Sequence, residues 1–434
     1  MKQVVSKPMM EMNKDLEQRE NIRYGILNRA FSEVGKTLAD PNIVLSLFVR
    51  QLGASNILVG LLSTIRYAGW FIPQIFVAGH VQHQARRGFI YVAAEGSRCL
   101  GYLILAALIL AIPNSPILLP LFFAVFAISY LGHGVGSVPR FDVIGRAIPS
   151  SMRGSFFARA NLIGGLLGFG AGFVVQSLLR GGADGPSVQR YAELILLSIV
   201  FYLLAIGAFR RIYEHDSPIL EGKPSMWRSL RGIPSLLRVN NNYRRLVGTL
   251  MLTDIARRVT DPFYIIFATE ILEVPIYYAG MYLSVLVFSK IVSNVLWDWL
   301  SRWLDNRRIL QLSSAAALAV PALTLAFANI GRNAGTSNGI AFASVFMLMG
   351  VRDSGKYIGK RSVFLDIVSQ EDRPIHWGTL NSLLGLASFL PVLAGTLIDG
   401  LGYTITFGLV SVVSLFGLWS SLRIRSVPDA LEPE

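Results

Sequence analysis

The sequence contains the same set of charges twice, each time within an apolar stretch. The first set is Glu33, Lys36, Asp40 and Pro41. The same order of acid, base, acid and proline recurs 221 positions later, in the set Asp254, Arg257, Asp261 and Pro262. A charge at the centre of a membrane helix costs at least about 2.5–3.5 kcal/mol. Two matched sets therefore indicate two homologous membrane halves that face a polar pathway, an arrangement typical of transporters.

The composition indicates a membrane protein. Only 15% of the 434 residues are charged and 53% are hydrophobic, with a mean hydropathy of +0.50, whereas a soluble globular chain carries about 25% charged residues. Apolar runs near the roughly 20 residues needed to cross hydrocarbon recur along the chain, so we predict an all-α membrane protein. The basic residues behind the net charge of +13 lie mainly in short loops between these runs. Positively charged cytoplasmic loops therefore explain this charge better than a nucleic-acid partner does.

Twelve transmembrane helices can be drawn, and turn residues such as Pro113-Asn-Ser-Pro116 separate them. Their approximate ranges are 26–50, 56–78, 89–112, 117–140, 157–180, 190–210, 246–271, 276–299, 308–330, 338–359, 376–398 and 403–422. The longest polar interruption includes a basic amphipathic segment at 227–238, which is suited to an anionic membrane surface.

These spans divide the chain into two bundles and three polar segments. The segments are an N-terminal tail (1–24), a first six-helix bundle (25–210), a linker with the amphipathic helix (211–245), a second six-helix bundle (246–423) and a C-terminal tail (424–434). Residues 1–24 lack the apolar core of a signal peptide. We interpret them as a cytoplasmic tail that ends in a short interfacial helix. The single cysteine, Cys99, excludes an intrachain disulfide framework.

Lys and Arg are unevenly distributed between the two sets of loops. With the N-terminus inside, the cytoplasmic loops carry Arg86, Arg87, Arg146, Arg153, Arg210, Arg211, Arg244, Arg245, Arg302, Arg307, Arg308, Lys360, Arg361, Arg373, Arg423 and Arg425. The opposite side carries only Arg50, Arg180, Arg190 and Arg332. The positive-inside rule then places both termini in the cytoplasm, and we expect a multi-pass protein of the cytoplasmic (inner) membrane.

The internal repeat extends beyond the first charges. An offset of 220 pairs Gly60 with Gly280, Arg87 with Arg307, Arg153 with Arg373, and Asn161 with Asn381. Spans one to six therefore map onto spans seven to twelve in the same order. Because six spans return the chain to its starting side, the halves have the same orientation and are related by an axis along the membrane normal.

The chain resembles the major facilitator superfamily of secondary transporters over essentially its whole length. The loop after span two, Gly79-His-Val-Gln-His-Gln-Ala-Arg-Arg87, keeps the glycine and two arginines of the family motif. The matching loop ends in Asn306-Arg-Arg308, with Asp298 where the family has Gly and Arg302 where it has Asp. The resemblance implies two six-helix bundles, alternating access, and a central cavity surrounded by spans one, four, seven and ten. It also implies gating loops that include Arg86, Arg87, Arg302, Arg307 and Arg308.

Charged stripes on the spans supply the candidate site. At about 100° per residue, Arg29, Glu33, Lys36 and Asp40 fall within about 60°, and such a stripe must face protein or water. The candidate substrate-binding or coupling residues are Arg29, Glu33, Lys36, Asp40, Arg66, Asp254, Arg257, Arg258, Asp261, Lys290, Arg352, Asp353 and Lys356. Candidates for substrate contact or packing are His133, Asn161 and Asn381. The alternative is that the pairs on spans one and seven are neutralised and only fix helix packing.

Cations outnumber acids in the spans, which favours a small polar solute with an anionic group. Acids on spans one and seven are candidate proton-binding sites. A flippase or exporter for an amphiphilic or lipid-linked substrate is the alternative within transport, and a non-transporting receptor is a further one. The sequence lacks a nucleophile–base signature, a metal-ligand cluster and a phosphate-binding loop, so we expect neither an enzyme nor a cofactor nor a metal site. The expected partners are the solute, protons and membrane lipids, and we expect a monomer.

Overall fold

A computed structural model of the protein describes residues 7–81, 84–181, 186–214, 240–330, 335–369 and 372–425. Within these ranges the regular secondary structure is entirely helical. The amphipathic segment expected at 227–238 lies outside the described residues.

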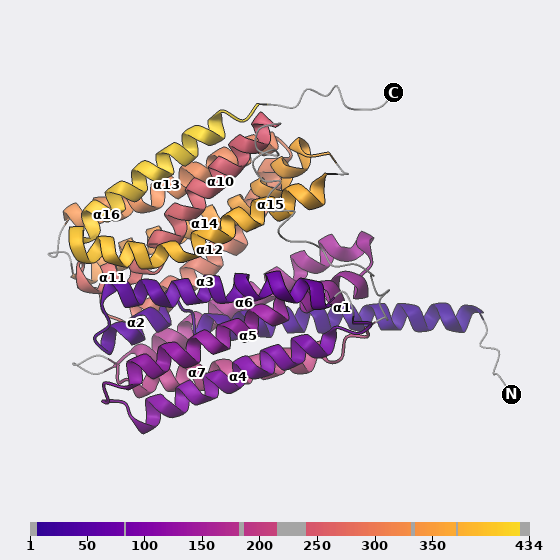
Figure 1. Ribbon diagram of the computed structural model, residues 1–434, viewed down its shortest axis with the longest axis horizontal. Coiled ribbons are helices and arrows are strands. Elements are labelled where there is room, and N and C mark those ends of the chain that lie inside the picture. Colours follow the sequence, from indigo (N-terminus) through magenta and orange to yellow (C-terminus); the bar gives the residue numbers. More distant parts are fainter. Residues whose placement is uncertain are drawn as a thin grey trace. The chain divides into compact units, whose positions relative to one another are not determined.

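The first half of the sequence forms a series of long helices (Figure 1). They are α1 (Lys7–Leu38), α2 (Val44–Gln51), α3 (Asn56–Val81), α4 (Gly88–Ala111), α5 (Leu118–Ala147), the 3₁₀ turn η1 (Ser150–Met152), α6 (Arg153–Leu179) and α7 (Gln189–Phe209). The expected tail and the first span are joined, because α1 continues without a break from Lys7 to Leu38.

The second half repeats this series. It contains α10 (Asn241–Thr260), α11 (Phe263–Glu270), α12 (Tyr278–Ser301), α13 (Asn306–Ile330), α14 (Gly335–Ile367), α15 (Arg373–Leu386), the 3₁₀ turn η3 (Ala387–Phe389) and α16 (Leu390–Leu422). The last two expected spans meet within α16, where Gly402 has a φ of 81° and interrupts the helical backbone. Each of the twelve expected spans thus coincides with helix.

The two matched prolines break their helices at equivalent places. The helix of span one ends at Leu38 and resumes as α2 at Val44, on either side of Asp40-Pro41. The helix of span seven ends at Thr260 and resumes as α11 at Phe263, on either side of Asp261-Pro262. Proline lacks the N–H for an intrahelical bond and its ring clashes with the preceding turn. Both spans are therefore broken where the matched prolines lie.

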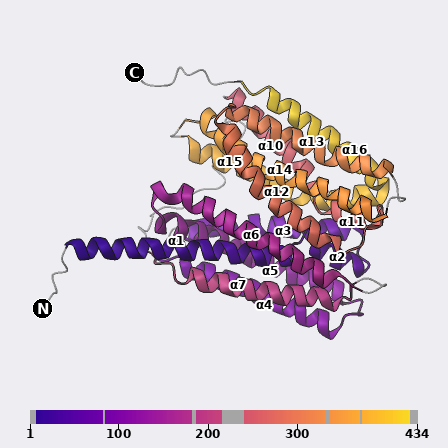
Figure 2. The ribbon, with the colours of Figure 1, turned by 180° about the vertical axis from the view of Figure 1, so that it is seen from behind.

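The helices gather into two compact units. The first comprises residues 1–40, 69–174 and 187–223, and the second comprises 41–68, 175–186 and 224–434. In the first unit, α1 packs on α7, and α4 packs on both α5 and α7. These helices lie side by side in both views (Figure 1, Figure 2). In the second unit, α10 packs on α16, and α13 packs on both α14 and α16.

The same packing scheme therefore occurs in both halves of the sequence, and one arginine pair shows it in detail. Arg153 donates from Nε to the carbonyl of Ile148 (3.0 Å), and Arg373 donates from Nε to the carbonyl of Val368 (3.3 Å). The donor and the acceptor of the second bond each lie 220 positions after those of the first bond in the sequence. Each arginine ties the start of one helix to the end of the helix before it, so the repeat seen in the sequence is also a repeat in structure.

The surface of these helices is apolar. Seven helices in the described part of the chain are long and apolar enough to cross a membrane. Large apolar side chains are exposed along them, including Leu100 (59%), Ile128 (70%) and Leu203 (54%). Exposing such a surface to water would be energetically unfavourable, whereas the acyl chains of a membrane are themselves apolar. The chain is therefore a multi-pass membrane protein.

Candidate functional site

A carboxylate on α10 is the first centre of a charged cluster in the second unit. One Oδ atom of Asp254 lies 2.7 Å from Lys356 Nζ and 3.1 Å from the Arg257 guanidinium. Its other Oδ atom lies 2.9 Å from Arg258 Nε. The Asp254 side chain is only 6% exposed. One buried carboxylate thus holds three cations, two from its own helix and one from α14.

A second centre lies where α10 ends. Arg352 on α14 donates to both carboxylate oxygens of Asp261, at 3.0 and 3.2 Å. It also bonds its neighbour Asp353 at 2.9 Å, and Lys290 of α12 approaches Asp353 at 3.2 Å. Arg257 joins the two centres, because its guanidinium lies 3.4 Å from Asp261 as well. The side chains of Arg352 and Asp261 are nearly sealed, at 3% and 4% exposed.

Helical spacing and close helix packing place these groups together. Asp254, Arg257, Arg258 and Asp261 are three, four and seven residues apart, so they share one face of α10. On α14, Gly355 lets the helix approach α12, since a Cβ there would lie 2.7 Å from the Trp297 ring. That approach brings Lys290 within reach of Asp353.

An aromatic ring from α3 covers part of this cluster. The ring centroid of Tyr67 lies 4.5 Å from the guanidinium of Arg258, 5.5 Å from that of Arg257 and 5.4 Å from that of Arg66. Its hydroxyl accepts from Arg257 at 3.4 Å. Ser388 in η3 accepts from Arg258 at 2.9 Å. Cations stack favourably on tyrosine faces, so Tyr67 orders three arginines at once.

Residues 41–68 belong to the first half by sequence but pack within the second unit. Arg50 forms an ion pair with Glu270, which also accepts from the Tyr403 hydroxyl at 3.0 Å. Asn56 donates to Asp399 at 2.7 Å and accepts from Tyr403 at 3.0 Å. These bonds join α2 and α3 to the end of α11 and to the part of α16 around the Gly402 break.

Glycines allow the helices to touch beside this network. A Cβ at Gly60 of α3 would overlap the carbonyl oxygen of Pro391, and a Cβ at Gly395 would overlap that of Asn56. The α3 and α16 backbones are therefore in direct contact.

In the first unit, Glu33 on α1 lies 3.1 Å from Lys36 and 3.8 Å from Arg29. Both cations are about half exposed, at 46% and 44% of their side chains. Asp40 is buried at the break after α1. The expected charged stripe is thus present, but its side chains are more exposed than those of its counterpart on α10.

A second titratable group in the first unit joins α4 to α5. Arg98 forms an ion pair at 2.6 Å with Glu95, three positions earlier on α4. His133 Nδ1 lies 2.7 Å from a Glu95 oxygen and 3.0 Å from an Arg98 nitrogen. The Arg98 guanidinium also stacks on Tyr202, 3.7 Å from the ring centroid. Sequence reasoning treated His133 separately, because nothing in the spacing indicates which helices lie side by side.

The remaining candidates lie elsewhere. Asn161 is exposed on α6, while Asn381 accepts a hydrogen bond from Lys360 at 2.9 Å. Arg87 pairs with Asp142 of α5 at 2.9 Å. Arg302 pairs with Asp298 and Arg307 pairs with Asp305, while Arg86 and Arg308 are exposed.

Sequence reasoning missed Tyr67, Ser388 and the network from Arg50 to Glu270. Their positions offered only weak signals, namely a tyrosine next to Arg66 and an offset of 220 between Arg50 and Glu270. Among the described residues, no group of His, Cys, Asp or Glu could hold a metal ion.

Comparison with solved structures identifies the fold. No family model matches the chain and no curated protein sequence matches it. The structure is similar to a POT family transporter in complex with 5-aminolevulinic acid, with a TM-score of 0.73, 12% identity, and 93% of this chain and 96% of that chain covered.

Two further neighbours transport other solutes. The nucleoside transporter NupG matches with a TM-score of 0.68 and 12% identity, over 93% of this chain and 99% of that chain. A D-xylose-proton symporter matches with a TM-score of 0.63 and 15% identity, over 95% and 98%. The chain has the fold of major facilitator superfamily transporters, which confirms the resemblance seen in the sequence at the level of the fold.

Proposed function

We propose that the chain is a secondary transporter that moves a small polar solute with an anionic group across the cytoplasmic membrane by alternating access. The observation that carries this proposal is the largely buried charged cluster on α3, α10, α12 and α14, in which cations outnumber carboxylates. Six cations contribute: Arg66, Arg257, Arg258, Lys290, Arg352 and Lys356. Three carboxylates face them: Asp254, Asp261 and Asp353. Solved neighbours that are transporters of unlike solutes support the transport class but not a substrate.

Arginine suits the recognition of such a solute. Its planar guanidinium binds a carboxylate or phosphate through two parallel hydrogen bonds. Arg258 is held on one side by Asp254 and on the other by the Tyr67 ring, so its geometry is set before a ligand arrives. An incoming anion would compete with Asp254 for Arg257, Arg258 and Lys356. That competition links solute binding to the release of a carboxylate.

The contacts of residues 41–68 with α11 and α16 act as a gate in this proposal. Alternating access requires that a pathway close on one side while it opens on the other. The ion pair between Arg50 and Glu270 and the glycine contact at Gly60 hold these segments together. Both contacts must separate before the pathway can open between these segments, because neither contact leaves space between the helices.

Proton coupling rests on carboxylates that exchange partners. A carboxyl group beside a cation favours the charged form, whereas one left without a cation in a dry site favours the protonated form. Glu33 with Lys36 and Asp254 with Arg257 would alternate between these states during the cycle. His133 with Glu95 adds a second place where a proton can be held. We place both termini in the cytoplasm and the protein in the inner membrane, following the distribution of Lys and Arg. We also propose that it acts as a monomer.

A ligand panel with charge-matched pairs tests the substrate class. Thermal unfolding of the purified protein would be measured with succinate against succinamide, and with glycerol phosphate against glycerol. A ligand that binds the native state raises the unfolding temperature, so members of the anionic set should stabilise the wild type. Arg258→Gln should abolish the shift, while the exposed Arg302→Gln serves as a control of equal charge. Stabilisation by neutral compounds alone, equal in Arg258→Gln, would refute an anionic substrate.

A further inference from the structure

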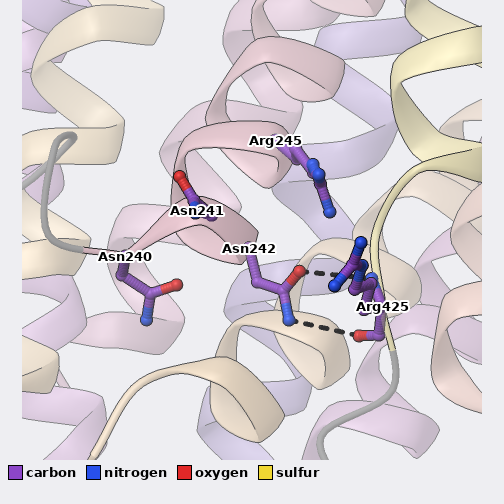
Figure 3. A pocket seen from close by; sticks show the side chains of 5 residues that line it. All are labelled: Asn240, Asn241, Asn242, Arg245 and Arg425. Carbon is purple, nitrogen blue, oxygen red and sulfur yellow. Dashed lines mark hydrogen bonds between the residues drawn. The ribbon is translucent and has the colours of Figure 1, made fainter.

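A basic hollow lies in the second unit, where α10 begins and α16 ends. It consists of two adjoining parts of about 430 and 600 Å³ that share Arg245 and Arg425. The smaller part is lined by the asparagines at 240–242 as well, and Arg245 and Arg425 point into it (Figure 3). The larger part adds Arg307 and Arg423. Neither part is lined by a carboxylate among the described residues.

The backbone beneath these arginines is fixed. Asn242 Oδ1 accepts from the Arg425 amide at 3.2 Å, and Asn242 Nδ2 donates to the Arg425 carbonyl at 3.3 Å (Figure 3). Arg245 donates to the carbonyl of Arg423 at 2.6 Å, and Arg307 donates to that of Ile424 at 3.4 Å. The end of the described chain is thereby bound to the first turns of α10 and α13. The backbone that carries Arg423 and Arg425 is thus held beside Arg245 and Arg307.

Among the described residues, few carboxylates balance the charge of this hollow. Asp305 pairs with Arg307. In the part of the chain that the structure describes, no salt bridge joins Arg245, Arg423 or Arg425 to a carboxylate. Like charges held near one another repel, so a bound anion would stabilise the arrangement.

An apolar stripe on α16 leads to the same place. Leu415, Phe416, Trp419 and Leu422 are each exposed by half or more of their surface. They follow the helical spacing of one face, and the guanidinium of Arg423 lies 3.5 Å from the Trp419 ring centroid. Exposed apolar side chains on a membrane helix face acyl chains, and tryptophan is typical of the level of the lipid headgroups. The hollow therefore lies where a membrane presents phosphate.

We propose that this basic hollow binds the phosphate of an anionic glycerophospholipid, whose acyl chains lie along the apolar stripe of α16. Arginine binds phosphate with paired, charge-assisted hydrogen bonds, and basic pockets between membrane helices suit anionic headgroups. The site is separate from the charged cluster around Asp254. It does not depend on which solute is transported.

Thermal unfolding of the full-length protein in a neutral detergent tests the site. The probes are dioleoylphosphatidylglycerol, dioleoylphosphatidylcholine and, as the soluble headgroup, glycerol phosphate. Arg425→Gln is the cleanest variant, because Asn242 bonds only the backbone of residue 425. Arg245→Gln combined with Arg425→Gln removes both shared arginines. The double variant Arg210→Gln with Arg211→Gln is the control, since both side chains are exposed and the charge change is the same.

Phosphatidylglycerol should raise the unfolding temperature of the wild type and of the control more than phosphatidylcholine does. Arg425→Gln should lose about half of this difference and the double variant nearly all of it, and native mass spectrometry should show fewer retained phosphatidylglycerol molecules. An equal phosphatidylglycerol effect in all proteins would overturn the site. A glycerol phosphate shift as large as that of phosphatidylglycerol, kept in Arg258→Gln but lost when both Arg245 and Arg425 are replaced by Gln, would overturn the lipid assignment in favour of a soluble anion.

Discussion

Arg352 and Asp261 form a buried ion pair in which one guanidinium nitrogen reaches both carboxylate oxygens, at 3.0 and 3.2 Å. The two residues lie 91 positions apart in the chain. Their pair connects the break between α10 and α11 to the middle of α14. The pair lies at the break between α10 and α11. If a solute displaced one partner of the pair, both helices would lose a contact at that break.

Neutralising one member of this pair should be strongly destabilising. Removing one partner of a buried ion pair typically costs about 3–5 kcal/mol, because the other charge stays buried. We expect Arg352→Gln and Asp261→Asn each to lower the unfolding temperature clearly, and the combined variant to recover much of the loss. A double-mutant cycle on the purified protein measures this coupling. Simple addition of the two losses would show that the pair does not act as a unit.

The Tyr67 ring should matter more than its hydroxyl. Tyr67→Phe keeps the cation–π contacts with Arg257 and Arg258, whereas Tyr67→Leu removes them. Such contacts contribute about 0.5–2 kcal/mol, so Tyr67→Leu should weaken solute binding by roughly 2- to 30-fold. Calorimetric titration with the ligand found in the panel gives the two dissociation constants. Equal weakening by both substitutions would assign the role to the hydroxyl.

The glycine contact should control the gate. A methyl group at Gly60 overlaps the Pro391 carbonyl, so Gly60→Ala should force α3 away from α16 and favour the arrangement in which this side is open. Hydrogen exchange of peptides covering 54–64 and 388–400 should become faster. Gly96→Ala is the matched control, because a Cβ at Gly96 meets nothing within 4 Å. Unchanged exchange in Gly60→Ala would exclude this contact as a gate.

Proton coupling should depend on the paired acids. We expect Asp40→Asn and Asp261→Asn to reduce transport sharply when flux is compared per amount of folded protein in the membrane. Glu33→Gln, Asp254→Asn and His133→Gln should each change how flux depends on pH. Solute uptake into proteoliposomes with an imposed pH gradient, with and without a protonophore, measures this. Flux that ignores the gradient in the wild type, with the same pH profile in all variants, would exclude coupling through these residues.

Asp305 should limit anion binding at the basic hollow. Burial alone would raise the pKa of Asp305, but its hydrogen bonds with Arg307 outweigh that effect and hold the pKa below its usual value. Asp305 therefore stays charged at neutral pH, and its stabilising bond to Arg307 is lost only as the pH falls through that lowered pKa. Asp305→Asn should free Arg307 and increase stabilisation by phosphatidylglycerol. A decrease would mean that Asp305 orients Arg307 for the phosphate.

Much of the fold follows from the sequence alone. The lengths of the apolar runs predicted the helices, since hydrocarbon thickness sets how many residues a span needs. The breaks in spans one and seven follow from the recurrence of Asp40-Pro41 as Asp261-Pro262, because proline disrupts a helix wherever it falls within one. The stripe on α10 was predictable too, as spacing along a helix determines which residues share a face.

Only the tertiary structure decided which charges meet. Nothing in the local sequence indicates that Lys356 reaches Asp254, 102 positions away, or that Glu95 and His133 share a hydrogen bond. The local sequence likewise does not indicate that Tyr67, from the first half of the sequence, lies over Arg257 and Arg258 in the second unit. Such contacts depend on how helices rotate and approach, which is set by packing between side chains and by small residues such as Gly355. Helical spacing determines the faces of each helix, and packing determines which faces touch.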